Sequence, residues 1–209
     1  MPVSYPAVMP TSGVTSIQWT NTTSSLVSRS PFSLKGQAQS WSGAIRFASV
    51  TVENLNREQA EDWIGFLDSL HGTLGTFLFG DPHAVVPLGT GGGSPKVLAV
   101  STSTRDVITI NGGPTGSTRP TWLKRGDWIQ LGTGLNARLY KVMQDVSVNS
   151  TGVSGNIILW PKFRINPVAG DTVIINNPKG LFRRANGSYS YSEDNGCKFS
   201  LAFDIEEVI

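Results

Sequence analysis

The residues that most often do chemistry in proteins are few in this sequence. It has two histidines, His71 and His83, and one cysteine, Cys197. Asp81 stands two residues before His83, a spacing that on a strand would place two metal ligands on one face, but a turn that ends a strand explains the Gly-Asp-Pro-His run better. Without a second cysteine, the sequence indicates neither a disulfide nor a thiolate metal site.

Carboxylate pairs and nucleophiles give no stronger signal. Glu193 and Asp194 are adjacent, whereas glycosidase carboxylates flank the bond that they cleave, so a solvated turn is the better interpretation. Cys197 precedes Lys198 in a strand-like run, and nothing else marks its thiol as a nucleophile. No serine lies in a Gly-x-Ser-x-Gly elbow. The sequence therefore predicts a protein that is not an enzyme, with no catalytic, cofactor-binding or metal-binding residues and no cofactor.

The tripeptide Arg125-Gly126-Asp127 matches a cell-adhesion signal, but a second Gly-Asp pair favours a structural interpretation. Gly170-Asp171 also stands directly before a strand-like run. Glycine adopts the backbone angles that a tight turn requires, and aspartate accepts hydrogen bonds from nearby amides. Ala169 takes the place of Arg125 in the second copy. We therefore interpret the arginine as incidental and predict that both Gly-Asp pairs are turns before strands.

Composition limits the classes of partner. The net charge is +2, from 17 basic and 15 acidic residues spread along the chain, so the sequence indicates no specific nucleic-acid binding. No apolar run approaches the roughly 20 residues of a membrane-spanning helix, and we expect no membrane partner. Charged residues make up 15% of the chain, against about 25% in a typical domain. Either an ordinary all-β chain or a subunit covered by its neighbours would explain this.

Short strands separated by turns dominate the pattern, and one helix interrupts them. The helix is expected over 56–71, with Asn56 as N-cap and Gln59 completing a capping box. Its apolar stripe consists of Ala60, Trp63, Ile64, Leu67 and Leu70. Strands are expected at 14–20, 32–41 and 44–52 before the helix, at five or six places between 97 and 176, and at 180–192 and 197–208 at the end.

The order of these elements predicts two domains. Residues 1–93 and 177–209 form a β-sandwich with the helix on its flank, and residues 94–176 form an inserted small β-barrel. The glycine-rich run 89–95 is interpreted as a flexible linker at the first junction, and 176–178 marks the second. The fold class is therefore mainly β.

The succession of segments resembles the minor tail proteins of siphophages, the long non-contractile-tailed bacteriophages, of the distal tail type. The matching stretches are SRSPFSLKGQAQSW, AEDWIGFLDSLHGTLGTFLFGDP, RGDWIQLG with RLYKVMQDV, LWPKFRINPVAGDTV and NPKGLFRRA. The helix followed by the phenylalanine-rich strand and the Gly-Asp-Pro turn carries most of the resemblance. The matching stretches occur in this order over most of the chain.

The resemblance implies a tail-tube-like sandwich whose copies form a ring, typically a hexamer, at the distal end of the tail tube. The implied partners are other copies of the chain, the tail tube protein and the tail tip or hub proteins, in the tail of the virion. It implies no catalytic residues. The alternative is a carbohydrate- or receptor-binding module acting through the barrel, because aromatic side chains can stack on sugars. The candidate residues are Trp19, Trp41, Trp63, Trp122, Trp128 and Trp160.

Overall fold

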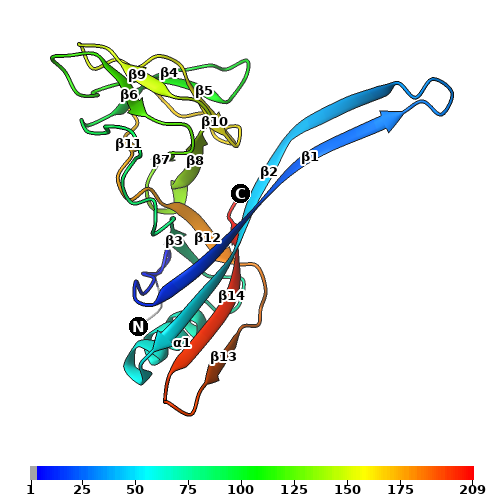
Figure 1. The fold of residues 1–209 in the computed structure, drawn as a ribbon, viewed down its shortest axis with the longest axis vertical. Coiled ribbons are helices and arrows are strands. Elements are labelled where there is room, and N and C mark those ends of the chain that lie inside the picture. Colours follow the sequence, from blue (N-terminus) through cyan, green and yellow to red (C-terminus); the bar gives the residue numbers. More distant parts are fainter. Residues whose placement is uncertain (1–3) are drawn as a thin grey trace.

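The computed structural model describes residues 4–209, apart from the side chain of Ser42. This part of the chain is mainly β, with 45% of residues in strands and 8% in helix. One six-stranded sheet, the main sheet, carries the single α-helix of the described residues, and a second six-stranded sheet curls into a barrel. Figure 1 shows the barrel at one end of the main sheet and a long hairpin leaving the body. The predicted fold class is confirmed.

The main sheet takes its strands from both ends of the chain. They are β1 (Val14–Arg29), β2 (Gly36–Leu55), β3 (Thr76–Phe79), β12 (Gly180–Arg184), β13 (Ser190–Glu193) and β14 (Phe199–Glu207). The order is β1-β2-β14-β12-β3, with β13 paired to β14, and all these pairings are antiparallel. All six strands lie within the segments expected to form the ring domain, of which residues 1–3 lie outside the described residues.

Helix α1 (Arg57–Ser69) covers one face of the main sheet. It begins at Asn56, whose side chain accepts from the Gln59 amide at 2.9 Å, while the Asn56 amide donates to the Gln59 side chain. This is the predicted capping box, which satisfies two amide donors at the helix start. Trp63 is fully buried, and Phe66 is buried where Ile64 was expected. The helix thus packs an aromatic face against the sheet.

The second sheet nearly closes into a barrel, in the order β11-β7-β8-β10-β5-β4. Its strands are β4 (Lys96–Val100), β5 (Val107–Asn111), β7 (Trp128–Leu131), β8 (Arg138–Val142), β10 (Ile157–Trp160) and β11 (Val173–Ile174). Its two end strands meet, because the Val97 amide donates to the Asp171 carbonyl and the Val173 amide to the Pro95 carbonyl. A ribbon of β6 (Arg119–Leu123) and β9 (Val146–Val148) and the 3-10 turn η1 (Gly134–Asn136) complete it.

The glycine-rich run between the sheets differs from the flexible linker expected at 89–95. The Gly91 amide donates to the Trp122 carbonyl at 2.9 Å. A Cβ atom on Gly89 would lie 2.3 Å from that same carbonyl oxygen, and one on Gly93 would lie 2.4 Å from the Gly112 oxygen. These glycines are therefore required by close backbone packing on the barrel, and the segment is fixed rather than loose.

The expected strand over 180–192 is wrong in extent. Strand β12 ends at Arg184, and β13 begins only at Ser190. In the turn between β13 and β14, Cys197 has a positive φ of 56°. Strand β14 alternates between its two faces, with Leu201, Phe203 and Ile205 buried.

Candidate functional site

The adhesion-like tripeptide is part of the barrel. Asp127 is 4% exposed, and its carboxylate accepts from the amides of Leu88 at 2.7 Å, Gly89 at 3.3 Å and Lys124 at 2.7 Å. An aspartate with this many backbone donors is not free to meet a receptor. It instead ties the segment before the barrel to the turn that precedes β7.

The second Gly-Asp pair forms the same turn, as the sequence predicts. The Val168 amide donates to the Asp171 carboxylate at 2.8 Å, and the Asp171 amide donates back to the Val168 carbonyl at 3.0 Å. Lys124 and Asp127 make the equivalent pair of bonds, at 2.7 and 3.0 Å. The glycines before the aspartates have φ values of 100° and 95°. Both pairs are therefore turns, and Arg125 has no part in the shared geometry.

Replacing Asp127 by alanine is expected to lower the free energy of unfolding by about 1–3 kcal/mol, because three amides lose their acceptor. Urea unfolding followed by tryptophan fluorescence measures this. The control is Arg125→Ala, whose exposed side chain should change stability by less than about 0.5 kcal/mol. Equal effects of the two substitutions would contradict the assignment of the tripeptide as a turn.

The other sequence candidates are not gathered into one site. The Asp81 carboxylate accepts from the His83 amide at 2.9 Å, which is the turn expected there. The Asp194 carboxylate accepts from the amides of Gly196 and Lys198, each at 2.8 Å, in the β13–β14 turn. Over residues 4–209 no group of three or more His, Cys, Asp or Glu side chains could hold a metal ion. None of the helices described there is long and apolar enough to cross a membrane.

The barrel carries a hollow of about 400 Å³ beside η1, lined in part by Arg138, Tyr140 and Asp171. No tryptophan lines it. Trp128 lines a second hollow, of about 260 Å³, and Trp41 and Trp160 line a third, of about 270 Å³. Three of the six tryptophans are buried, namely Trp63, Trp122 and Trp128. The one tryptophan that is about half exposed, Trp41, lies on the hairpin and not on the barrel.

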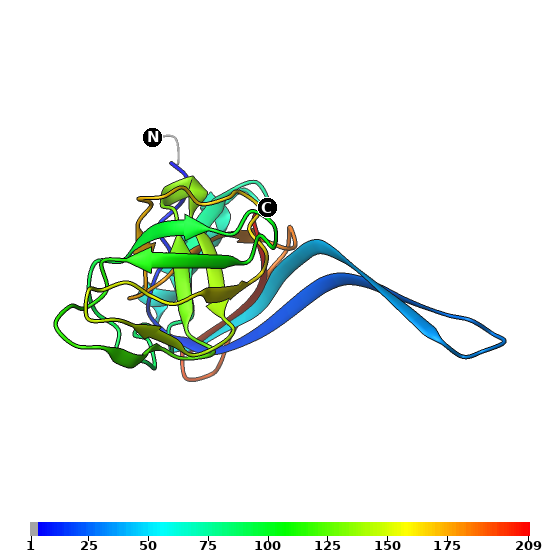
Figure 2. The same ribbon diagram turned by 90° about the horizontal axis from the view of Figure 1, so that it is seen from above.

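The long hairpin of β1 and β2 projects far from the body (Figures 1 and 2). We call residues 22–41 the arm. Within the arm the two strands pair from Ser25 with Ser40 to Arg29 with Gly36, after a register shift between Thr23 and Ser25, and residues 30–35 form the tip. All arm residues are exposed except Ser30, which is half-buried. The arm is thus a two-stranded ribbon without a third layer.

Apolar side chains of the arm are uncovered. They are Leu26, Val27, Phe32, Leu34 and Trp41, with exposed fractions from 51% at Trp41 to 98% at Phe32. Leu26 and Val27 are consecutive on β1 and so point to opposite faces of the ribbon. Within residues 4–209, neither face of the ribbon is therefore covered at this pair of residues. An isolated two-stranded hairpin is marginally stable in water, and such exposed apolar side chains mark an interaction surface.

The arm also has open edges. Strand β1 ends the strand order of the main sheet and pairs only with β2, so its outer amides and carbonyls have no strand partner among the described residues. Strand β2 pairs with β14 only from Phe47 onward. Open strand edges favour pairing with another chain.

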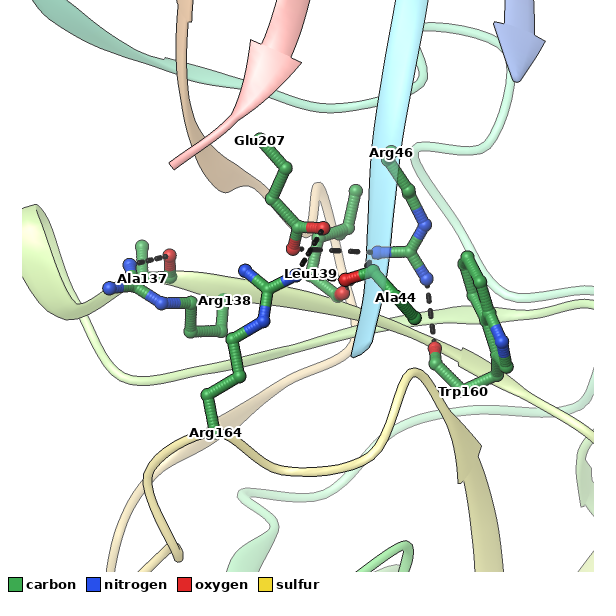
Figure 3. A network of polar contacts seen from close by, with 8 residues as sticks. All are labelled: Ala44, Arg46, Ala137, Arg138, Leu139, Trp160, Arg164 and Glu207. Carbon is green, nitrogen blue, oxygen red and sulfur yellow. Dashed lines mark hydrogen bonds and ion pairs between the residues drawn. The ribbon is translucent and has the colours of Figure 1, made fainter. Parts of the chain in front are cut away.

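A buried arginine joins the main sheet to the barrel (Figure 3). Arg46 of β2 is 0% exposed, and its guanidinium carbon lies 4.8 Å from the ring centroid of Trp128 and 4.6 Å from that of Trp160. It donates to the carbonyls of Leu139 and Trp160, the second at 2.8 Å. These partners come from β7, β8 and β10. One side chain of the main sheet therefore contacts three barrel strands.

Glu207 supplies the opposing charge. Its carboxylate lies 3.8 Å from Arg46 and 3.9 Å from Arg164, which also donates to the Ala44 carbonyl. Burial lowers the pKa of Arg46 to about 10 and raises the pKa of Glu207, and the attraction between the two charges opposes both shifts. Removing Glu207 would leave the buried Arg46 without its ion-pair partner, and removing Arg46 would leave Glu207 with only the more distant Arg164 as ion-pair partner.

Apolar packing and backbone bonds reinforce this junction. Trp128 and Leu139 of the barrel belong to the same buried cluster as the main sheet, and the Trp19 and Trp128 rings lie 5.5 Å apart. The Lys179 amide donates to the Gln130 side chain at 2.8 Å, and the Leu181 amide to the Ala137 carbonyl at 3.1 Å. The barrel is thus fixed in orientation on the main sheet.

No family model and no curated protein matches the chain. The class of protein that the geometry defines is a mainly β chain with an uncovered arm and a barrel fixed to its main sheet. Neither the arm nor Arg46 and Glu207 was singled out as functional in the sequence. The sequence did contain a pattern that indicates burial of Arg46. The residue alternates with Ala48 and Val50 on one strand face, and both of these are buried.

Proposed function

We propose that this chain is a structural subunit of a bacteriophage tail. Copies form a closed ring, of six by the resemblance to distal tail proteins, that joins the distal end of the tail tube to the tail tip or baseplate. The observation that supports this best is the arm, with apolar side chains uncovered on both faces and open edges. A protein whose work is to assemble needs such a surface and needs no catalytic site.

The direction in which the arm points supports assembly with another molecule. It leaves the body and does not fold back on it (Figure 2), so only another molecule can cover it. A contact between an arm and a different surface of the next copy is head-to-tail, and head-to-tail contacts either close into a ring or continue as a filament. Neighbouring rings of tail tube protein and tip or hub proteins would cover the remaining faces within the virion.

Shortening the arm tests assembly without disturbing the body. Thr23 and Ala44 are cross-strand partners, so residues 24–43 can be replaced by an Asn-Gly turn that closes the hairpin there. The variant is expected to keep the unfolding midpoint of the wild type, since no buried apolar residue is removed, and to be monomeric where the wild type associates. Sedimentation velocity measures both proteins. Unchanged association of the shortened variant would contradict the assembly role of the arm.

The position in the virion tests the whole proposal. A density map of the tail should contain this chain as a single ring at the distal end of the tube, with the barrel outside. A stacked repeat along the tube, or a place only at fibre tips, would refute it. A glycan array with the full chain tests the alternative: specific glycan binding that is lost on substitution of Arg138 and Tyr140 in the barrel hollow would favour the carbohydrate-binding function.

A further inference from the structure

The arm differs in charge from the rest of the chain. Residues 1–52 contain no aspartate or glutamate. Arg29, directly before the tip, and Lys35, the last residue of the tip, are both exposed. The surface that covers the arm must therefore tolerate positive charge as well as apolar side chains, and an acidic surface would favour it.

Helix α1 presents such a surface. On its outer side Glu58, Glu61 and Asp62 are exposed, and Glu61 and Asp62 follow Glu58 by three and four residues, which places them along one face. Asp68 is exposed two turns beyond Glu61, and its carboxylate accepts from the Tyr189 hydroxyl at 2.8 Å. One basic residue of the helix, Arg57, is also exposed. Figure 1 shows α1 at the end of the body away from the arm, so the arm cannot reach the α1 of its own chain. The basic arm and the acidic helix face can therefore meet between two copies of the chain.

Gly65 is a separate observation that points to the same face. It lies in the middle of α1 among these acidic residues, is exposed, and would have no atom within 4 Å of an added Cβ. A glycine inside a helix is less stable than alanine there by roughly 1 kcal/mol, and nothing in the chain requires it. A missing side chain on an exposed face is useful where another backbone approaches the helix closely.

The lengths of the two elements also agree. The eight residues 22–29 of β1 extend over about 26 Å at roughly 3.3 Å per residue. Helix α1 has 13 residues and is about 20 Å long at roughly 1.5 Å per residue. One arm can therefore cover the whole outer face of one helix.

We propose that the arm of one copy lies along the outer face of α1 in the next copy, with Arg29 and Lys35 against its acidic residues and the ribbon backbone close to Gly65. The occupant is a second copy of this chain, and the inference rests on the proposed self-assembly. Each copy gives one arm and receives one, so the contact is head-to-tail and makes a ring possible.

Charge exchange tests the contact. Variant A carries Arg29→Glu and Lys35→Glu, and variant B carries Glu61→Lys and Asp62→Lys. Each alone places like charges in the contact and is expected to associate about 100-fold more weakly than the wild type. A mixture of A and B restores opposite charges at every contact and should restore assembly, in rings with an even number of subunits. Mass photometry and sedimentation velocity measure this.

Two further variants separate charge from packing. Lys124→Glu with Arg125→Glu makes the same charge change on the exposed surface of the barrel and should leave assembly unchanged. Gly65→Gln is expected to fold, because the added Cβ meets nothing, and to weaken association at least tenfold by keeping the ribbon away. Increasing salt should weaken wild-type association, since charges at the contact are screened.

The outcomes distinguish the inference from the proposed function. Assembly of A and B separately, or no recovery on mixing while the wild type forms rings, would overturn the arm–α1 contact and leave the ring. Recovery on mixing into open filaments would support the contact and overturn the closed ring. A wild type that stays monomeric at high concentration and low salt would overturn both.

Discussion

Replacing Trp63 by alanine is expected to lower the free energy of unfolding by about 3–5 kcal/mol. Its side chain is fully buried, with ring centroids 6.0 Å from Phe66 and 5.8 Å from Phe203. Truncation leaves a cavity between α1 and the main sheet. The indole nitrogen also donates to the Ser12 carbonyl at 2.9 Å, so the segment before β1 loses its bond to the helix. Urea unfolding measures the change.

Trp41→Ala is the matched control, because it is the same substitution at a side chain that is 51% exposed on the arm. It should change the free energy of unfolding by less than about 0.5 kcal/mol, while weakening association if the arm is an assembly surface. A Trp63→Ala variant as stable as Trp41→Ala would show that α1 does not stabilise the main sheet.

The features that the sequence predicts well are those with local causes. The start of α1 depends on Asn56 and Gln59, three residues apart, and the structure contains the expected reciprocal bonds. The turn at Asp127 and that at Asp171 depend on a glycine and on amides within three residues. Strand β14 alternates because one face is buried. Such patterns need no knowledge of what lies across the sheet.

The arm could not be predicted because none of the residues that the structure describes buries it. Apolar and polar residues alternate along a strand when one of its faces is buried. Residues 21–29 are all exposed, so this part of the strand has no buried face. The sequence therefore indicates a strand that ends near residue 20, whereas β1 continues to Arg29. For the same reason two separate strands, 32–41 and 44–52, were expected where β2 runs unbroken from Gly36 to Leu55. If another molecule covers the arm in an assembly, the order of apolar and polar residues in the arm fits the surface of that neighbour and not a core within the chain.

The junction between the two sheets could not be predicted from the sequence, because its residues are far apart along the chain. Arg46, Trp128 and Glu207 are far apart in sequence, and their proximity depends on the strand order of two sheets. The Gly-rich run 89–95 was misinterpreted for a related reason. Glycine permits both mobility and close packing, and only the structure places the Trp122 carbonyl against Gly89.

Arg46→Met is expected to lower the free energy of unfolding by about 3–5 kcal/mol, the range for removing one partner of a buried ion pair. Methionine fills much of the same space, but Glu207 loses its nearer cation, and the carbonyls of Leu139 and Trp160 lose their donor. The double variant Arg46→Met, Glu207→Gln should be more stable than Arg46→Met alone, because the buried carboxylate that has lost its nearer cation is gone. Urea unfolding followed by tryptophan fluorescence measures the change.

A second ion pair of the main sheet can show what sets the cost of removing the arginine: the burial of the pair or the distance between its two charged groups. Arg183 and Glu206 lie only 2.7 Å apart, closer than the 3.8 Å between Arg46 and Glu207, but their side chains are 44% and 23% exposed. Water already solvates this pair, so Arg183→Met should cost at most about 1 kcal/mol. If Arg183→Met proved as costly as Arg46→Met, proximity would matter more than burial. The desolvated cluster would then not be what fixes the barrel on the sheet.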